Sequence, residues 1–280
     1  MVASFVTTSV QSTSALSVEA TGVSITYYLR LWYTLPYSFL TVPITTAMFT
    51  ELSDYWAQGD RESFARGIVS GSEQILFFLV PFMLYLMVFS MPLVSVLAAG
   101  SFSHEALSMT ASYLSVYALS LPAYAVYMYL QKVASAMRRM ALCAVANAIA
   151  AVVQVVTLFV FTPVFGLNFV AFSSFLFFMT LCTVMFASLR RALGHIGFGG
   201  VLASFLRSML LGLAGAFVGS LILQGLNSPA GACDGSPLRS VGYCVVAGIP
   251  ALTVTYVGGL LLRVPEAKAI GRLVKKLLRR

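Results

Sequence analysis

One long interval without charged residues sets the fold class of this chain. Residues 140–189 read MALCAVANAIAAVVQVVTLFVFTPVFGLNFVAFSSFLFFMTLCTVMFASL. A helix needs about 20 mostly apolar residues to cross the hydrocarbon core of a bilayer. The interval is long enough for two such helices, and Pro163, Gly166 and Asn168 mark the turn between them. It therefore predicts a pair of transmembrane helices.

Similar apolar intervals with few charged residues, on both sides, predict further spans. The earlier interval 2–19 is weaker because Ser and Thr dilute it, and it lacks the basic start of a signal peptide. We interpret it as a polar helix that faces the bundle interior, or as one whose start has been cut away. The chain is thus expected to be an all-α polytopic membrane bundle with seven or eight transmembrane helices. The seven clearer spans are 23–50, 66–98, 106–131, 140–162, 168–189, 200–225 and 240–262.

The composition agrees with a membrane protein. Of the 280 residues, 59% are hydrophobic and 9% are charged, and the mean hydropathy is +0.91. Soluble domains carry about 25% charged residues, so the composition excludes a water-soluble enzyme or a free DNA-binding protein. The net charge of +8 is concentrated at the end of the chain, where residues 263–280 hold seven basic residues against Glu266 alone. We therefore expect membrane lipids as partners, and no nucleic acid.

The distribution of basic residues predicts the orientation. Lys and Arg gather in 132–139, in and beside 190–199 and after the last span, whereas 99–105 and 163–167 have none and the loop near 226–239 has only Arg239. Cytoplasmic loops of membrane proteins carry an excess of Lys and Arg. Because the basic and non-basic connections alternate regularly, loops 51–65, 132–139 and 190–199 and the C-terminus are predicted to face the cytoplasm.

The C-terminal segment is predicted to be an amphipathic helix on the membrane surface. Its apolar residues recur at helical spacing, and basic side chains occupy the rest of the helical wheel. We expect these basic residues to anchor the tail to anionic lipid. They are Lys268, Arg272, Lys275, Lys276 and Arg279.

No pattern of residues indicates catalysis, a metal site or a cofactor. The acidic residues Asp54, Asp60 and Glu62 alternate with arginines in a predicted cytoplasmic loop, which is typical of a solvated loop. Cys233 and Cys244 lie 11 positions apart near the predicted outer side, where a disulfide is an open alternative. The chain is not expected to be an enzyme.

Arg30 is the charged residue with the strongest functional indication. It lies inside span 23–50, and helical spacing places Tyr27, Thr34 and Tyr37 on its side of the helix. An arginine in a polar stripe suits a water-filled cavity for an anionic head group, since a guanidinium can bind phosphate bidentately. The alternative is that Arg30 snorkels to the outer head groups. Pro36 lies in the same span and predicts a bend.

Several segments resemble MviN/MurJ-type lipid II flippases of the multidrug/oligosaccharidyl-lipid/polysaccharide exporter superfamily. The most specific are GVSITYYLRLWYTLP at 22–36 and VPITTAMFTELS at 42–53, and PVFGLNFVA at 163–171 matches a turn of that family. Aligned without a gap, Leu31 falls at the family's cavity arginine and Arg30 at the neighbouring acidic position.

This resemblance implies a transporter with two six-helix lobes around a central cavity, followed by extra helices. Residues 1–190 would form the second lobe, 191–262 the additional helices and 263–280 the cytoplasmic tail. The substrate would be a polyprenyl-diphosphate-linked peptidoglycan precursor, moved across the bacterial plasma membrane by alternating access. Its site residues would be Arg30 for the diphosphate, Tyr27, Thr34 and Tyr37 for the cavity wall, and Pro36 as hinge.

Three other functions stay open from the sequence. The chain could move another polyprenyl-linked glycan, or export drugs as other members of the superfamily do. It could also be a non-transporting membrane partner or a truncated lobe. A separate chain that supplies the first lobe is a partner compatible with transport.

Overall fold

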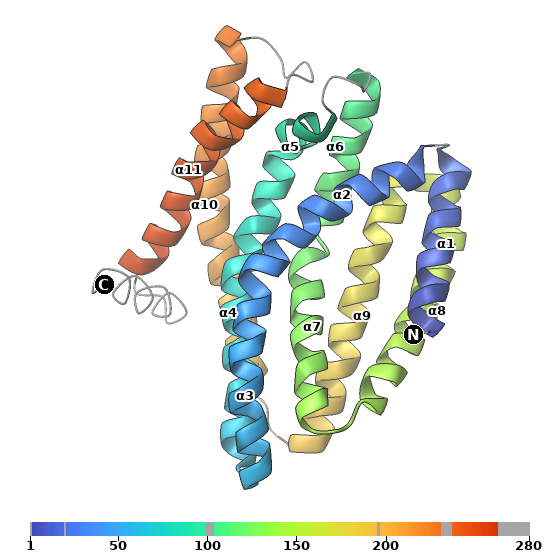
Figure 1. Cartoon of the computed structure of the whole chain (residues 1–280), viewed down its shortest axis with the longest axis vertical. Coiled ribbons are helices and arrows are strands. Elements are labelled where there is room, and N and C mark those ends of the chain that lie inside the picture. Colours follow the sequence, from blue (N-terminus) through green and yellow to red (C-terminus); the bar gives the residue numbers. More distant parts are fainter. Residues whose placement is uncertain (1, 20, 99–103, 195–196, 231–236, 263–280) are drawn as a thin grey trace.

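The computed structural model is helical throughout and describes residues 2–19, 21–98, 104–194, 197–230 and 237–262 (Figure 1). Those ranges contain no strand, and the predicted all-α membrane bundle is confirmed. The elements are α1 (Val2–Val18), α2 (Gly22–Pro36), the π-helix η1 (Tyr37–Thr41), α3 (Val42–Gln58), α4 (Arg61–Val88), α5 (Ser90–Ala98), α6 (His104–Ala118), α7 (Leu121–Ala136), α8 (Ala141–Phe165), α9 (Leu167–Leu193), α10 (Phe198–Ala230) and α11 (Pro237–Leu261).

Five helices of the described chain are each long and apolar enough to cross a membrane, namely α4, α8, α9, α10 and α11. The other predicted spans are built from shorter helices. Span 23–50 consists of α2, η1 and α3, and span 106–131 is divided between α6 and α7 at Leu119 and Ser120. Span 66–98 is interrupted at Phe89, where α4 ends before α5 begins. The number of seven or eight complete crossings therefore stays a prediction.

The helix ends fall into two groups at opposite ends of the bundle. In Figure 1 the α3–α4 and α7–α8 connections and the end of α9 lie at the lower end, whereas the α1–α2 and α8–α9 turns lie at the upper end. The lower group contains the loops predicted to be cytoplasmic. The fold thus brings these three connections to one end, as their predicted common side of the membrane requires.

The acidic residues Asp54, Asp60 and Glu62 lie at that end, and one of them caps a helix. Asp60 is the N-cap of α4, and its Oδ1 accepts a hydrogen bond from the backbone N–H of Ser63 at 2.9 Å. Hydrogen bonds from Ser63 lower the pKa of Asp60 below its ordinary value. Beside it, the guanidinium carbon of Arg61 lies 3.5 Å from the centre of the Trp56 ring. These contacts explain the cluster as a capped, solvated turn.

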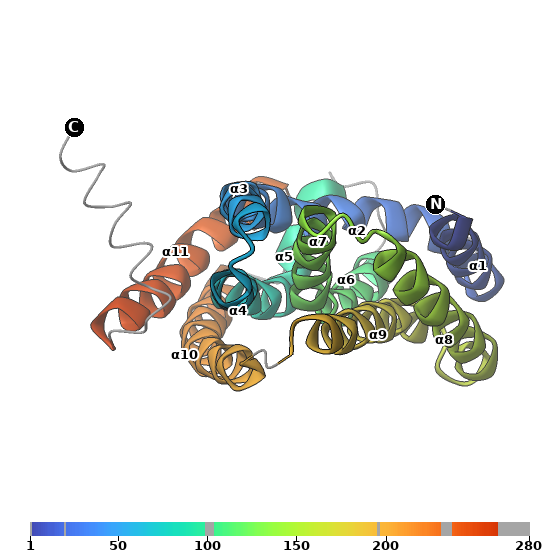
Figure 2. The same cartoon turned by 90° about the horizontal axis from the view of Figure 1, so that it is seen from below.

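Helix α4 is the centre of the core, with α3, α7 and α10 packed around it (Figure 2). Close packing with α10 and α11 depends on small residues. A Cβ atom built on Gly212 would lie 2.8 Å from Leu84 Cδ1, and one on Gly215 would lie 2.6 Å from the carbonyl oxygen of Ala251. The GxxxG pattern of Gly215 and Gly219 therefore serves packing within one bundle, as expected for such a pattern in a polytopic protein.

Gly215→Val is expected to destabilise the fold by about 1–3 kcal/mol, because the added side chain has no room against α11. Denaturant unfolding in detergent micelles measures the change. Gly225→Val is the matched control on the same helix, since a Cβ there meets nothing within 4 Å. Equal stability of the two variants would contradict the packing role of Gly215.

Candidate functional site

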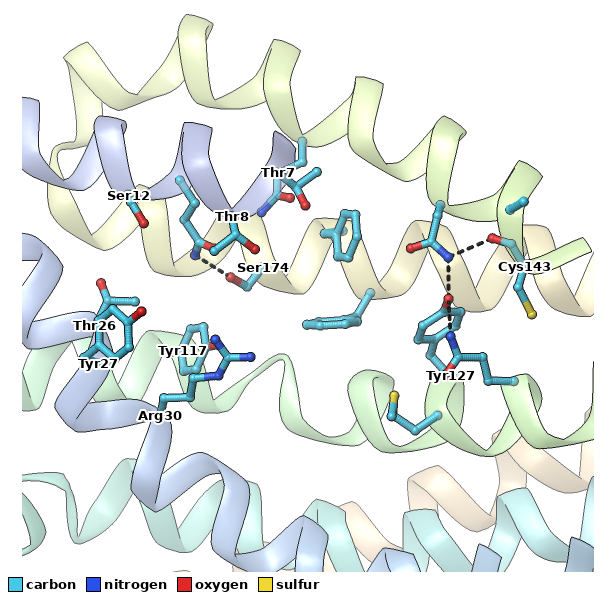
Figure 3. A pocket seen from close by; sticks show the side chains of 18 of the residues that line it. Thr7, Thr8, Ser12, Thr26, Tyr27, Arg30, Tyr117, Tyr127, Cys143 and Ser174 are labelled. Carbon is cyan, nitrogen blue, oxygen red and sulfur yellow. Dashed lines mark hydrogen bonds between the residues drawn. The ribbon is translucent and has the colours of Figure 1, made fainter. Parts of the chain in front are cut away.

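A polar cavity of about 780 Å³ opens between six helices. Its walls come from α1, α2, α6, α7, α8 and α9, so it lies on the side of the bundle away from α10 and α11 (Figures 2 and 3). A volume of this size is typical of sites for small molecules or head groups. The predicted polar helix 2–19 contributes to it through Thr7, Thr8, Gln11 and Ser12 of α1, which agrees with an inward-facing polar helix.

Arg30 supplies the positive charge of this cavity. Every other lining residue in the described chain is uncharged. Figure 3 shows the guanidinium directed into the cavity beside Tyr117. Leu31, the residue that aligns with the family's arginine, is not among the residues of the wall and is 57% exposed. A single cation in the wall of an open cavity with polar lining is suited to an anionic group such as a diphosphate.

The structure brings only part of the predicted stripe into the cavity. Tyr27 and Arg30 line it, whereas Thr34 and Tyr37 are not among its lining residues. The Thr34 hydroxyl instead donates to the carbonyl oxygen of Arg30 at 2.6 Å. The Tyr37 ring packs on Tyr124, with 4.9 Å between ring centres.

Pro36 is the last residue of α2, and the backbone hydrogen bonding changes just after it. The N–H of Tyr37 bonds to the carbonyl of Thr34, and the N–H of Val42 bonds to that of Tyr37. The second bond spans five residues, which defines the π-helix η1. Figure 1 shows α2 running obliquely and α3 nearly along the bundle axis, so the chain bends through η1.

Sequence reasoning missed the amides that line the cavity. Gln11 Nε2 donates to Ser174 Oγ at 2.9 Å, which links α1 to α9. Asn147 Nδ2 donates to the hydroxyl oxygen of Tyr127 at 2.5 Å, which links α8 to α7. The available signal was the presence of uncharged amides inside apolar spans, because a buried amide needs a hydrogen-bond partner.

Two predictions fall on segments outside the described residues. The anchoring tail, with Lys268, Arg272, Lys275, Lys276 and Arg279, is one of them, and Cys233 is the other. The membrane-surface role of the tail and the pairing of Cys233 with Cys244 therefore stay predictions.

Comparisons with known proteins agree with this architecture. A family model described as "Lipid II flippase MurJ" matches residues 1–233. The chain is similar to a solved structure of a lipid II flippase MurJ in an inward closed conformation, with a TM-score of 0.72 and 20% identity. The similarity covers 93% of this chain and 52% of that one, so the chain spans about half the length of that flippase. No curated protein sequence matches the chain.

The structural similarity supports the helical membrane fold, and the family model supports membership over most of the chain. The chain belongs to the MurJ lipid II flippase family.

Proposed function

We propose that this chain forms the second lobe of a flippase that moves a polyprenyl-diphosphate-linked peptidoglycan precursor (lipid II) across the bacterial plasma membrane. The head group would occupy the polar cavity while the lipid tail stays in the bilayer. Alternating access would expose the cavity to one side of the membrane and then to the other.

The observation that carries this proposal is the position of Arg30. Its guanidinium lies in the wall of a cavity whose other described lining residues are uncharged. A charge in this position is costly unless it meets an anion or water, which is why intramembrane charges mark transport pathways. Tyr27 lies beside Arg30 in the wall. Thr34 and Tyr37 would act indirectly, through the Arg30 backbone and the packing of Tyr124.

Within this proposal, residues 1–190 form the lobe and 191–262 the additional helices α10 and α11. Both added helices pack on the side of α4 and α5, away from the cavity. The basic tail 263–280 would hold the C-terminus on the cytoplasmic surface through anionic lipids.

Transport is tested in proteoliposomes that contain labelled lipid II. One sample holds the chain alone, and a second holds it together with a first-lobe chain of the same family. We expect faster loss of label from one leaflet than in protein-free vesicles in at least the two-lobe sample. A rate equal to that of empty vesicles in both samples would contradict flippase activity. The same vesicles with other polyprenyl-linked glycans measure the substrate preference.

The orientation is tested by labelling single cysteines in an otherwise cysteine-free chain. Gln58 lies at the α3–α4 end and Phe165 at the α8–α9 end, and both are exposed. In intact spheroplasts, an impermeant maleimide is expected to label Phe165→Cys, and to label Gln58→Cys only after permeabilisation. The reverse pattern would contradict a cytoplasmic C-terminus.

A further inference from the structure

A second polar cluster occupies the part of the cavity near the α7–α8 connection. It consists of Tyr127 and Gln131 on α7 and Asn147 on α8. Asn147 Nδ2 donates to Tyr127 Oη at 2.5 Å and to the Cys143 carbonyl at 2.7 Å, and Gln131 Nε2 donates to Tyr127 Oη at 3.3 Å. Figure 3 shows Tyr127 and Cys143 at one end of the drawn site and Arg30 toward the other.

These hydrogen bonds leave specific groups for a ligand. The Tyr127 hydroxyl accepts two hydrogen bonds, which leaves its own proton to donate. Within the described chain, the side-chain carbonyl oxygens of Asn147 and Gln131 accept no hydrogen bond. The cluster therefore offers one hydroxyl donor and two amide acceptors, held in place by its own internal bonds.

The cavity lining beside the cluster is aromatic and uncharged. The Phe178 ring centre lies 6.5 Å from that of Tyr127, and Phe177 packs edge-on against Phe178 at 5.2 Å. Both phenylalanines line the cavity. The nearby Lys132 ammonium is directed to α3 instead, 5.9 Å from the centre of the Phe49 ring.

Uncharged donors and acceptors beside aromatic rings are complementary to a sugar, which carries hydroxyl and amide groups at its edges and apolar C–H groups on its faces. They are less suited to a stem peptide, whose carboxylates would meet no cation among the residues that line this part of the cavity. They are equally unsuited to a diphosphate, for which Arg30 has the right charge.

We propose that Tyr127, Gln131 and Asn147 form a glycan subsite, distinct from the diphosphate subsite at Arg30. The inference rests on the proposed function, because it divides one head group between two parts of the same cavity. The sugar hydroxyl and acetamido N–H groups would donate to the amide oxygens of Asn147 and Gln131. The Tyr127 hydroxyl would donate to a sugar oxygen, and Phe177 or Phe178 would cover an apolar face of the ring.

The subsite is tested by binding of three lipids to the full chain in nanodiscs. They are undecaprenyl diphosphate, the same lipid carrying one N-acetylhexosamine, and lipid II. Asn147→Ala is expected to lower the affinity for both glycosylated lipids by about tenfold. It should change the affinity for undecaprenyl diphosphate by no more than about twofold. Arg30→Ala is expected to weaken the binding of all three lipids. Asn168→Ala is the matched control, since Asn168 bonds Ser112 and does not line the cavity.

Retained binding of undecaprenyl diphosphate shows that the Asn147 variant is folded, so the comparison is internally controlled. If Asn147→Ala weakens the binding of all three lipids equally, the glycan subsite is contradicted while the proposed function stays intact. If Asn147→Ala weakens the binding of lipid II alone, the cluster contacts the peptide, and the glycan assignment is contradicted. If the unmodified chain binds none of the three, the proposed function fails, and the subsite with it.

Discussion

Arg30→Ala is expected to lower the affinity of the chain for a polyprenyl diphosphate by about 10- to 100-fold. This range corresponds to the loss of about 1.5–3 kcal/mol that is typical of a hydrogen bond to a charged group. The expectation is large because the described cavity wall offers the diphosphate no second cation. In a two-lobe sample, the rate of lipid II flipping at subsaturating substrate is expected to fall by a similar factor.

The control variants separate charge from geometry. Arg30→Lys keeps the charge but loses the planar pair of donors, and an intermediate affinity is expected. Arg239→Ala removes a cation from α11, which contributes no residue to the cavity, and should leave binding unchanged. If Arg30→Ala binds and flips normally, the arginine serves only to reach the head groups of the bilayer, and the diphosphate site lies elsewhere.

The sequence was sufficient to identify Arg30 but not its surroundings. A lone charge inside a long apolar interval is conspicuous without any tertiary information. Its cavity, however, depends on contacts between helices that lie far apart in the chain, such as that of Gln11 with Ser174, which are 163 positions apart. Such pairs follow from helix packing, which hydropathy does not encode.

The helical regions of the chain could be predicted, while the interruptions within them could not. Charge-free intervals mark residues that tolerate lipid, and continuous helices and broken ones satisfy this condition equally well. The break at Leu119 and Ser120 is stabilised by tertiary contacts, since Ser120 Oγ donates to the hydroxyl of Tyr33 at 3.2 Å. Pro122 follows this break at the start of α7, but a proline alone does not distinguish a bend from a new helix.

The predicted stripe leaves the cavity beyond Arg30. Beyond Arg30, α2 crosses α6 and α7, where Tyr33 packs on Tyr117 and Tyr124 at 4.6 and 5.2 Å. Tyr37 then begins a π-helix, whose wider turn shifts the angular position of every later residue. A helical wheel applies to α2 as far as Pro36, but it does not show which neighbouring helices α2 contacts.

Replacing both Pro36 and Pro43 by alanine is expected to slow flipping by about tenfold or more while changing head-group affinity by less than about threefold. Proline has no N–H, so Pro43 cannot bond to the carbonyl of Phe39, four residues earlier and inside η1. Alanine restores that donor and removes a penalty of about 3 kcal/mol per proline for a regular α-helix. The double variant should therefore favour a straight helix in place of α2, η1 and α3.

Under the proposed alternating-access mechanism, α2 would change its angle to α3, and a straightened helix would oppose that change. A bias of about 1.4 kcal/mol toward one conformation is enough to reduce the population of the other tenfold. Arg30 stays in place on α2, so binding is less affected than turnover. Pro163→Ala is the matched control, since Pro163 lies exposed within the continuous helix α8, and it should flip at the unmodified rate. Wild-type flipping by the double variant would show that the bend at η1 is static, and that the moving element must be sought at another break in the bundle.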